Sequence, residues 1–162
     1  MNQLLKNISQ AFSLSRGGFP IIIILLLIQI NIAQIAQPKL YERGTLDIRI
    51  TGFPNDDGEC WFGLDNAEAV YESEDSVFIG KILPIINGEV IINIASLEYG
   101  YYAIRIFHDE NSNGELDSNF LGIPTEDYGY SNNVSAWFGA PSWERAKFLF
   151  NQKEMAIEIS VD

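Results

Sequence analysis

The segment Asp109–Asp117, DENSNGELD, places oxygen-bearing residues at alternate positions around a glycine. Side-chain oxygens fall at its first, third, fifth and ninth positions, and the backbone carbonyl of Glu115 falls at the seventh. Calcium is a hard ion that takes about six to eight oxygen ligands, and this is the ligand order of the first nine residues of an EF-hand loop, with Gly114 at the sharp turn. The spacing predicts a calcium site whose ligands are Asp109, Asn111, Asn113, Glu115 and Asp117.

The segment departs from an EF-hand at its twelfth position, where Phe120 stands in place of a bidentate glutamate. With two carboxylates in the ring, we expect a weak site, with a dissociation constant of about 10⁻⁴–10⁻³ M. Further oxygens would have to come from neighbouring acidic residues, for which the candidates are Glu110, Asp56, Asp57 and Glu126. Asp, Asn, Ser and Gly are also ordinary turn formers, so a metal-free turn is the alternative interpretation.

Two further reactive residue types occur once each. His108 ends a run of alternating apolar residues and is expected to be a hydrogen-bonded structural residue rather than a metal ligand. Cys60 alternates with Phe62 and Leu64, which predicts a buried, unreactive thiol. A single cysteine also excludes a disulfide within the chain.

The elements that would hold this loop are short strands with period-two patterning. In TLDIRIT, Leu46, Ile48 and Ile50 share one face, as in a half-buried strand. Asn87-Gly88 predicts a tight hairpin turn, and residues 146–150 and 157–161 predict a closing hairpin. The spacing of Tyr102 after a turn is typical of the tyrosine corner of immunoglobulin-like domains. We therefore predict an all-β fold, a seven-stranded antiparallel immunoglobulin-like sandwich.

Residues 118–144 lack strand patterning and are rich in aromatic residues. Connections longer than about 12–15 residues are usually functional or disordered, and the rings favour an ordered loop packed over the sandwich. Aromatic rings and amides suit ligand contact. The residues of this segment that we expect to form a ligand surface are Tyr128, Tyr130, Asn132, Asn133 and Trp137.

The N-terminal region has the order of a secretory signal peptide. Lys6 and Arg16 precede an apolar run that begins at Phe19, and small residues including Ala36 follow it. We expect residues 1–36 to be a cleaved signal peptide or a retained membrane anchor, 37–44 a linker and 45–162 the sandwich domain. The protein would then be exported, to the periplasm, the cell envelope or the outside. Its formal charge of −12 argues against nucleic acid as a partner.

The run YAIRIFHDENSNGELDSNFLGIPTEDYGYSNN, residues 102–133, resembles a family of exported bacterial proteins, domain of unknown function 2141. The family pattern HD-N-NG-LD-N--G-P-E-YG-SNN is met here, and FGAPSWERAKF is similar to the family's ending, with Ala140 where proline is common. The resemblance implies a transthyretin-like or carboxypeptidase-regulatory-like sandwich in the cell envelope. It implies no activity.

These observations favour a non-enzymatic binding or structural module that docks a glycan, a peptide or an envelope protein, with membrane contact only through an uncleaved N-terminal segment. A hydrolase using Asp109, Asp117 and Glu126 is one alternative, although no catalytic motif is present. A purely structural, metal-free domain is the other.

Overall fold

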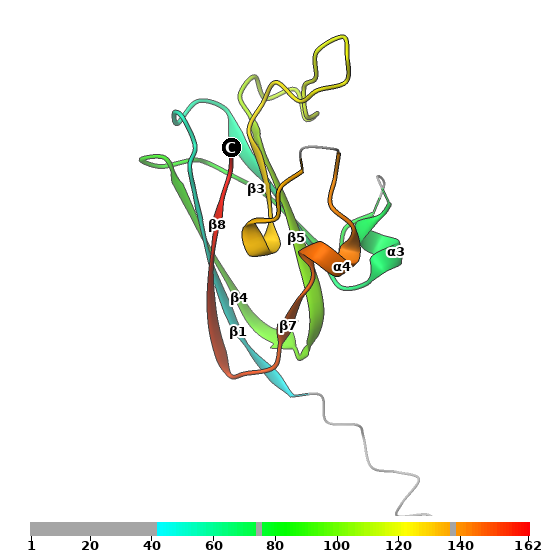
Figure 1. Ribbon diagram of the computed structural model, residues 1–162. Coiled ribbons are helices and arrows are strands. Elements are labelled where there is room, and N and C mark those ends of the chain that lie inside the picture. Colours follow the sequence, from blue (N-terminus) through cyan, green and yellow to red (C-terminus); the bar gives the residue numbers. More distant parts are fainter. Residues whose placement is uncertain (1–41, 74–75, 137–138) are drawn as a thin grey trace, which may run out of the picture. The chain divides into compact units, whose positions relative to one another are not determined.

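Two β-sheets face each other in the part of the chain that the computed structural model describes, residues 42–73, 76–136 and 139–162 (Figure 1). The strands are β1 (Arg43–Thr51), β2 (Glu59–Asp65), β3 (Ile79–Leu83), β4 (Glu89–Glu98), β5 (Gly100–Asp109), β6 (Tyr128–Tyr130), β7 (Phe148–Phe150) and β8 (Glu154–Ser160). Three short helical segments join them, namely α3 (Glu68–Tyr71), η1 (Ser131–Asn133) and α4 (Trp143–Ala146). The all-β sandwich is confirmed.

The predicted domain limits fall partly outside this region. Residues 1–36 and most of the predicted linker lie outside the described residues, and β1 begins at Arg43, within the predicted linker 37–44. None of the helices in the described ranges has the length and apolar character required to cross a bilayer.

The three-stranded sheet has the order β4-β1-β8 and contains a parallel pair. β1 pairs antiparallel with β4, but it pairs parallel with β8, where Ile48 lies opposite Ile157. The prediction that all strands are antiparallel is therefore wrong for β8. The physical reason is that β8 enters from a turn at the start of β1, where the amide of Thr45 donates to the carbonyl of Lys153 (2.8 Å).

The five-stranded sheet is built around β5. Its order is β3-β2-β5-β6, and the remaining strand, β7, also pairs with β5. β6 pairs with residues 105–107 and β7 with residues 100–102, so both short strands share one edge of β5 at different heights. β6 is a strand inside the predicted loop 118–144, which raises the number of strands in the described ranges from the expected seven to eight.

The two predicted hairpins do not pair as expected. β7 belongs to one sheet and β8 to the other, so residues 146–150 and 157–161 form a connection between the sheets. The turn at Asn87-Gly88 does form, with φ of 55° and 71°, but β3 and β4 also lie in different sheets, and only Ile86 and Glu89 bridge across it. In each case the two strands joined by the turn lie in opposite sheets, with their apolar faces packed on the core between the sheets.

The core lies between the two sheets and is made of the residues whose alternation was visible in the sequence. Leu46, Ile48 and Ile50 of β1 are buried against Ile104 of β5 and its neighbours. Cys60 is fully buried, as predicted, and burial raises the pKa of its thiol to about 12. Tyr102 is buried and its hydroxyl donates to the carbonyl of Glu98 (2.8 Å), which confirms the tyrosine corner.

Candidate functional site

The loop Asp109–Asp117 begins where β5 ends, at one end of the sandwich (Figure 1). Asp109 is the last residue of β5 and lies opposite Glu59, the first residue of β2. Gly58 precedes β2 with a φ of +68°, and a Cβ atom there would lie 2.0 Å from the carbonyl oxygen of Asp109. Only glycine allows this close approach, which fixes the backbone at the first position of the loop.

Asp109 is fully buried, and its carboxylate organises the turn that follows it. Oδ1 accepts a hydrogen bond from the amide of Asn113 (3.0 Å), and Oδ2 accepts one from the amide of Gly114 (2.7 Å). Oδ2 also accepts the indole N–H of Trp61 (3.1 Å). A carboxylate offers about four acceptor sites, so these three bonds leave room for one further partner.

Two other side chains of the predicted ring, those of Asn111 and Asn113, reach Asp117. The amide nitrogen of Asn111 donates to Asp117 Oδ2 (2.6 Å), and that of Asn113 donates to Asp117 Oδ1 (3.2 Å). Asn113 Oδ1 accepts the backbone N–H of Glu115 (2.8 Å). The structure thus joins Asn111, Asn113 and Asp117 through their side chains, whereas Asp109 contacts the loop through the backbone amides of Asn113 and Gly114.

Glu126 fastens the two ends of this loop to each other. It is buried, and its two carboxylate oxygens accept the backbone N–H groups of Glu110 and Asp117, each at 2.9 Å. Of the proposed helpers, Asp56 serves elsewhere. It caps the turn at Asn87-Gly88, and the amide donors of Gly88 and Asn87 hold the pKa of its carboxyl below the usual range.

The carboxylates of Asp109, Asp117 and Glu126 have no cationic partner in the described part of the chain, and Glu110 has only His108 near it, at 3.7 Å. The ion pairs found there do not involve Asp109, Asp117 or Glu126. Burying an unpaired carboxylate is costly unless hydrogen bonds or a cation compensate it. The donor set of carboxylate, amide and carbonyl oxygens suits a hard cation such as calcium, although no group of three or more His, Cys, Asp and Glu side chains arranged to hold a metal occurs among the described residues.

His108 lies beside the loop and faces the core. It is fully buried, its Nε2 lies 2.6 Å from the carbonyl oxygen of Asp57, and Phe53 packs edge-on against its ring. Nδ1 lies 3.7 Å from Glu110 Oε1 and has no hydrogen-bond partner among the residues that the structure describes. This environment matches the structural role expected from the sequence.

The predicted ligand surface separates into two groups. Tyr128 and Tyr130 line a groove of about 630 Å³ on the outer face of the five-stranded sheet, with their rings in edge contact. The side chain of Asn132 instead donates to the carbonyls of Arg145, Ala146 and Lys147, and that of Asn133 bonds to Glu158 and Ser160 of β8. Trp137 lies outside the described residues.

Trp61 is the residue of this region that the sequence did not single out. Its ring stacks on Phe107 (centroids 5.5 Å apart) in the wall of the groove, while its N–H binds Asp109. Gly114 lies against the same ring, and Leu116 lines the groove. The loop and the groove therefore share one side chain. The only signal in the sequence was that Trp61 occupies the face of β2 opposite to Cys60.

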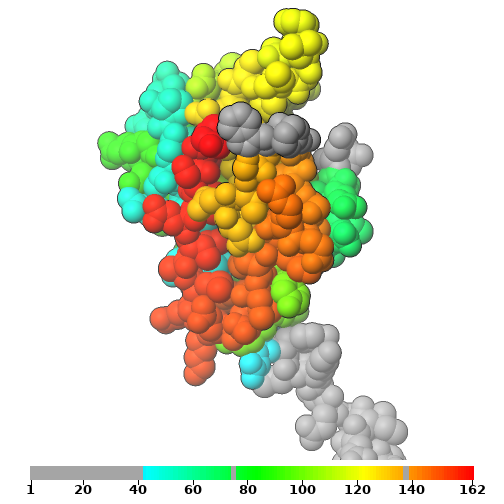
Figure 2. All heavy atoms as spheres, viewed as in Figure 1, coloured from blue at the N-terminus to red at the C-terminus, as the bar shows by residue number. Residues whose placement is uncertain are grey.

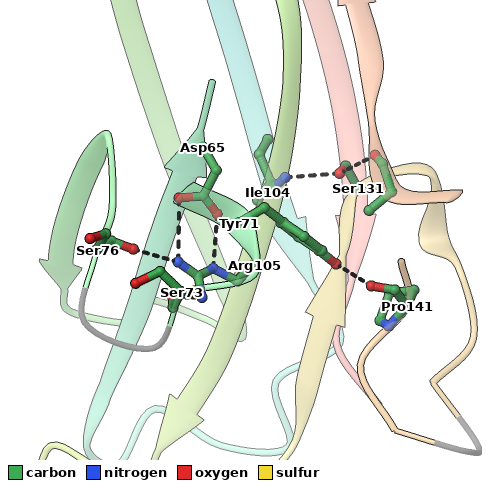
Figure 3. Close-up of polar contacts among 9 residues, drawn as sticks. Asp65, Tyr71, Ser73, Ser76, Ile104, Arg105, Ser131 and Pro141 are labelled. Carbon is green, nitrogen blue, oxygen red and sulfur yellow. Dashed lines mark hydrogen bonds and ion pairs between the residues drawn. The ribbon is translucent and has the colours of Figure 1, made fainter. Parts of the chain in front are cut away.

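A second polar cluster lies on the same outer face, farther from the loop (Figure 3). Asp65 is fully buried, and Arg105 Nε lies 2.8 Å from its Oδ2. Arg105 also donates to the carbonyls of Ser73 and Ser76. Burial raises the pKa of Asp65, and the guanidinium of Arg105 lowers it in part. This cluster ties the connection after α3 to β5 and was not predicted.

A family model matches residues 48–158, which run from within β1 to within β8 and include the whole loop. The family is described as an uncharacterized protein conserved in bacteria (DUF2141). This finding confirms the resemblance drawn from residues 102–133. Comparison with curated proteins and with solved structures gave no match.

Proposed function

The chain belongs to the DUF2141 family, and from that premise we propose that it is a non-enzymatic, exported β-sandwich module whose loop at Asp109–Asp117 binds a calcium ion. Asp109, Asn111, Asn113, Asp117 and the carbonyl of Glu115 would hold the ion. Bound there, calcium would supply positive charge beside Asp109 and Asp117, which have no lysine or arginine partner among the described residues. The protein's own residues set the shape of the loop and connect it to the groove.

The observation that supports this proposal is a loop of polar side chains around Asp117. Asn111 and Asn113 both reach Asp117, and Asp109 accepts the backbone amides of Asn113 and Gly114 from the strand end. A plain turn requires Gly114 and one or two side-chain caps. It does not require a fully buried aspartate at its first position or the buried Glu126 that joins its ends.

The arrangement also indicates what calcium must displace. The amide nitrogens of Asn111 and Asn113 currently donate to Asp117, and coordination would use the amide oxygens instead. The orientation of an amide group follows its hydrogen bonds, so its nitrogen and oxygen exchange places readily. Turning them would also remove the bonds in which Asn111 Oδ1 accepts the amide of Asn113 (3.0 Å) and Asn113 Oδ1 accepts that of Glu115 (2.8 Å). The loss of these four hydrogen bonds is consistent with the weak site expected from a ring with two carboxylates.

Replacing Asn111 and Asn113 together by aspartate is expected to lower the melting temperature in chelator and to enlarge the stabilisation by calcium. Without the ion, two more carboxylates face Asp117. With it, a ring of four carboxylates should bind at least about tenfold more tightly. For the unmodified protein at 10-fold to 100-fold excess over the dissociation constant, calcium should add about 1.4–2.7 kcal/mol of stability. Thermal unfolding with and without calcium measures both effects.

Asn93→Asp is the matched control for this experiment. Asn93 donates to Asp47 Oδ1 (2.7 Å) on the exposed face of β1 and β4, so the substitution creates the same repulsion far from the loop. The control should lose stability in chelator, and its calcium-induced shift should equal that of the unmodified protein, because its loop is intact. Two results would establish the metal-free turn. One is an equal calcium-induced change in melting temperature in the control and the loop variant. The other is no calcium-induced change in the loop variant and none in the unmodified protein.

The alternative of a carboxylate hydrolase has less support in the contacts of these residues. A general acid or base must reach a substrate proton. Both carboxylate oxygens of Glu126 accept backbone amides. Asp109 is fully buried, and its carboxylate accepts three hydrogen bonds. As the ligand surface of the module we propose the groove beside the loop, where Tyr128 and Tyr130 offer rings to a glycan, a peptide or another envelope protein.

A further inference from the structure

The segment Ser118–Pro124, which we call the apolar tip, exposes three large apolar side chains. Phe120 is 95% exposed, Leu121 68% and Ile123 56%. The sequence between residues 118 and 124 contains no charged residue. Packing of Phe120 over the sandwich, as expected for the rings of this region, does not occur. Apolar side chains grouped in this way mark an interaction site, whereas isolated ones need no explanation.

The backbone of the apolar tip satisfies most of its own hydrogen-bonding groups. The amide of Asn119 donates to the carbonyl of Ile123, and that of Gly122 donates to the carbonyl of Asn119, each at 2.8 Å. The side-chain oxygen of Asn119 accepts the amides of Leu121 (2.9 Å) and Ile123 (3.2 Å). Ser118 and Pro124 bridge at the base, and Pro124 has no N–H group to satisfy.

The internal pairing of these backbone groups distinguishes two possible binding partners of the apolar tip, a protein pocket and a lipid layer. A protein pocket can supply partners to unpaired backbone groups, whereas the interior of a lipid layer supplies none, so backbone that enters lipid must be satisfied internally. Gly122, with a φ of +76°, allows the sharp turn that presents Leu121 and Ile123 on a narrow tip. The apolar tip suits a lipid-inserting element, since its exposed side chains are apolar and the amides of Asn119, Leu121, Gly122 and Ile123 are paired within it.

The position and the charge of the surroundings add a constraint on the lipid. The yellow segment that contains the apolar tip projects beyond the strands of the sandwich (Figures 1 and 2). At its base Glu110 and Glu115 are exposed and Asp117 is half-buried. These carboxylates repel an anionic surface within about 10 Å at ordinary ionic strength. Neutral headgroups are therefore the better match.

We propose that the apolar tip inserts into the surface of a lipid bilayer with zwitterionic headgroups. Phe120, Leu121 and Ile123 enter the acyl boundary, and the acidic loop stays in water. The proposal goes beyond calcium binding and does not rest on it, because the contacts that shape the tip come from Asn119 and the tip's own backbone.

Fluorescence of tip variants in the full chain tests the insertion. A Phe120→Trp variant mixed with phosphatidylcholine vesicles should show a blue-shifted emission that is quenched by brominated acyl chains. Ile91→Trp is the matched control, because Ile91 is 66% exposed on the outer face of the three-stranded sheet. The apolar N-terminal residues are present in both variants, so a difference in quenching reports the tip alone.

Removal of the side chains gives the complementary measurement. Phe120→Ser combined with Leu121→Ser should weaken binding to phosphatidylcholine vesicles about a hundredfold, because two large apolar side chains leave the acyl boundary. Ile91→Ser should leave binding unchanged. Since Phe120 and Leu121 are exposed, the variants should keep the melting temperature of the unmodified protein, and a retained melt shows that folding is not the cause.

Several results would overturn the proposal. Equal quenching of the two tryptophan variants, or equal vesicle binding by the two serine variants, would show that the tip does not enter lipid. A blue shift of the Phe120→Trp variant that grows with protein concentration in the absence of vesicles would assign the tip to a second copy of the chain. Stronger quenching in vesicles that contain phosphatidylglycerol would overturn the assignment of neutral headgroups.

Discussion

Replacing Arg105 by methionine is expected to destabilise the sandwich by about 3 kcal/mol, because it leaves the buried carboxylate of Asp65 without its cation. Removal of one partner from a buried pair costs about 3–5 kcal/mol, and the lower end applies because the side chain of Arg105 is 30% exposed. The same substitution removes the hydrogen bonds to Ser73 and Ser76. Urea unfolding measures the loss.

The double variant Asp65→Asn with Arg105→Met is the control for this interpretation. With the carboxylate gone, the buried site no longer carries an uncompensated charge, so the double variant should recover part of the stability that Arg105→Met loses. An exposed ion pair, Lys147 with Glu144, gives the scale for a surface contact, since such pairs contribute at most about 1 kcal/mol. If Arg105→Met lowered the free energy of unfolding by no more than about 1 kcal/mol, the Arg105–Asp65 pair would contribute no more than an exposed ion pair, and the prediction would be wrong.

The stability of Arg105→Met should also depend on pH more steeply than that of the unmodified protein. Burial raises the pKa of Asp65 above its ordinary 3.8, and Arg105 lowers it in part, so removing Arg105 raises it further. A group with a raised pKa in the folded state stabilises the fold when it is protonated, and this contribution is lost as the pH rises through the folded pKa. The difference between the two proteins should therefore shrink as the pH falls toward 3.8. A constant difference from neutral to acidic pH would exclude this linkage.

Replacing Glu126 by alanine is expected to open the loop at Asp109–Asp117 at a cost of about 3 kcal/mol, because two charge-assisted hydrogen bonds disappear. The amides of Glu110 and Asp117 lose their acceptors together, and both ends of the loop are released. Hydrogen exchange of these two amides should accelerate before that of the strands does. Stabilisation by calcium should also decrease, since the ring is no longer preformed.

Glu126→Gln separates the charge of this residue from its shape. The glutamine keeps one oxygen acceptor but turns an amide nitrogen toward the second backbone N–H, so its loss should fall between that of alanine and that of the unmodified protein. Glu144→Ala, at an exposed glutamate of α4, should leave exchange at Glu110 and Asp117 unchanged. Unchanged exchange in Glu126→Ala would show that the loop holds its form without this carboxylate.

Local pattern was enough to predict the fold class. Alternation at Leu46, Ile48 and Ile50 predicted a half-buried strand, and the structure buries all three. The spacing of Tyr102 after its turn predicted a hydrogen bond that closes over four residues. The contacts of Asn111 and Asn113 with Asp117 are local in the sequence as well, and the calcium site at this loop stays a prediction.

Partners distant in the sequence were not predictable. Asn132 and Asn133 have residue types suited to a ligand surface, yet their amides are used by carbonyl and amide groups of α4 and β8. Trp61 carried no motif, but the pairing of β2 with β5 places its N–H on Asp109, 48 residues away. Phe120 was expected to pack and instead is exposed, in a tip whose Asn119 side chain bonds to the tip's own amides.

The sequence by itself thus determined which residues face inward, where the chain turns and which oxygens could surround a cation. Only the tertiary structure decided that β8 runs parallel to β1, that β7 joins the opposite sheet, and that the loop and the groove share Trp61. The reason is that alternation of apolar and polar residues shows which face of a strand is buried. It does not show which other strand lies beside it, because all the strands alternate in the same way. The choice among neighbours depends on packing across the whole core.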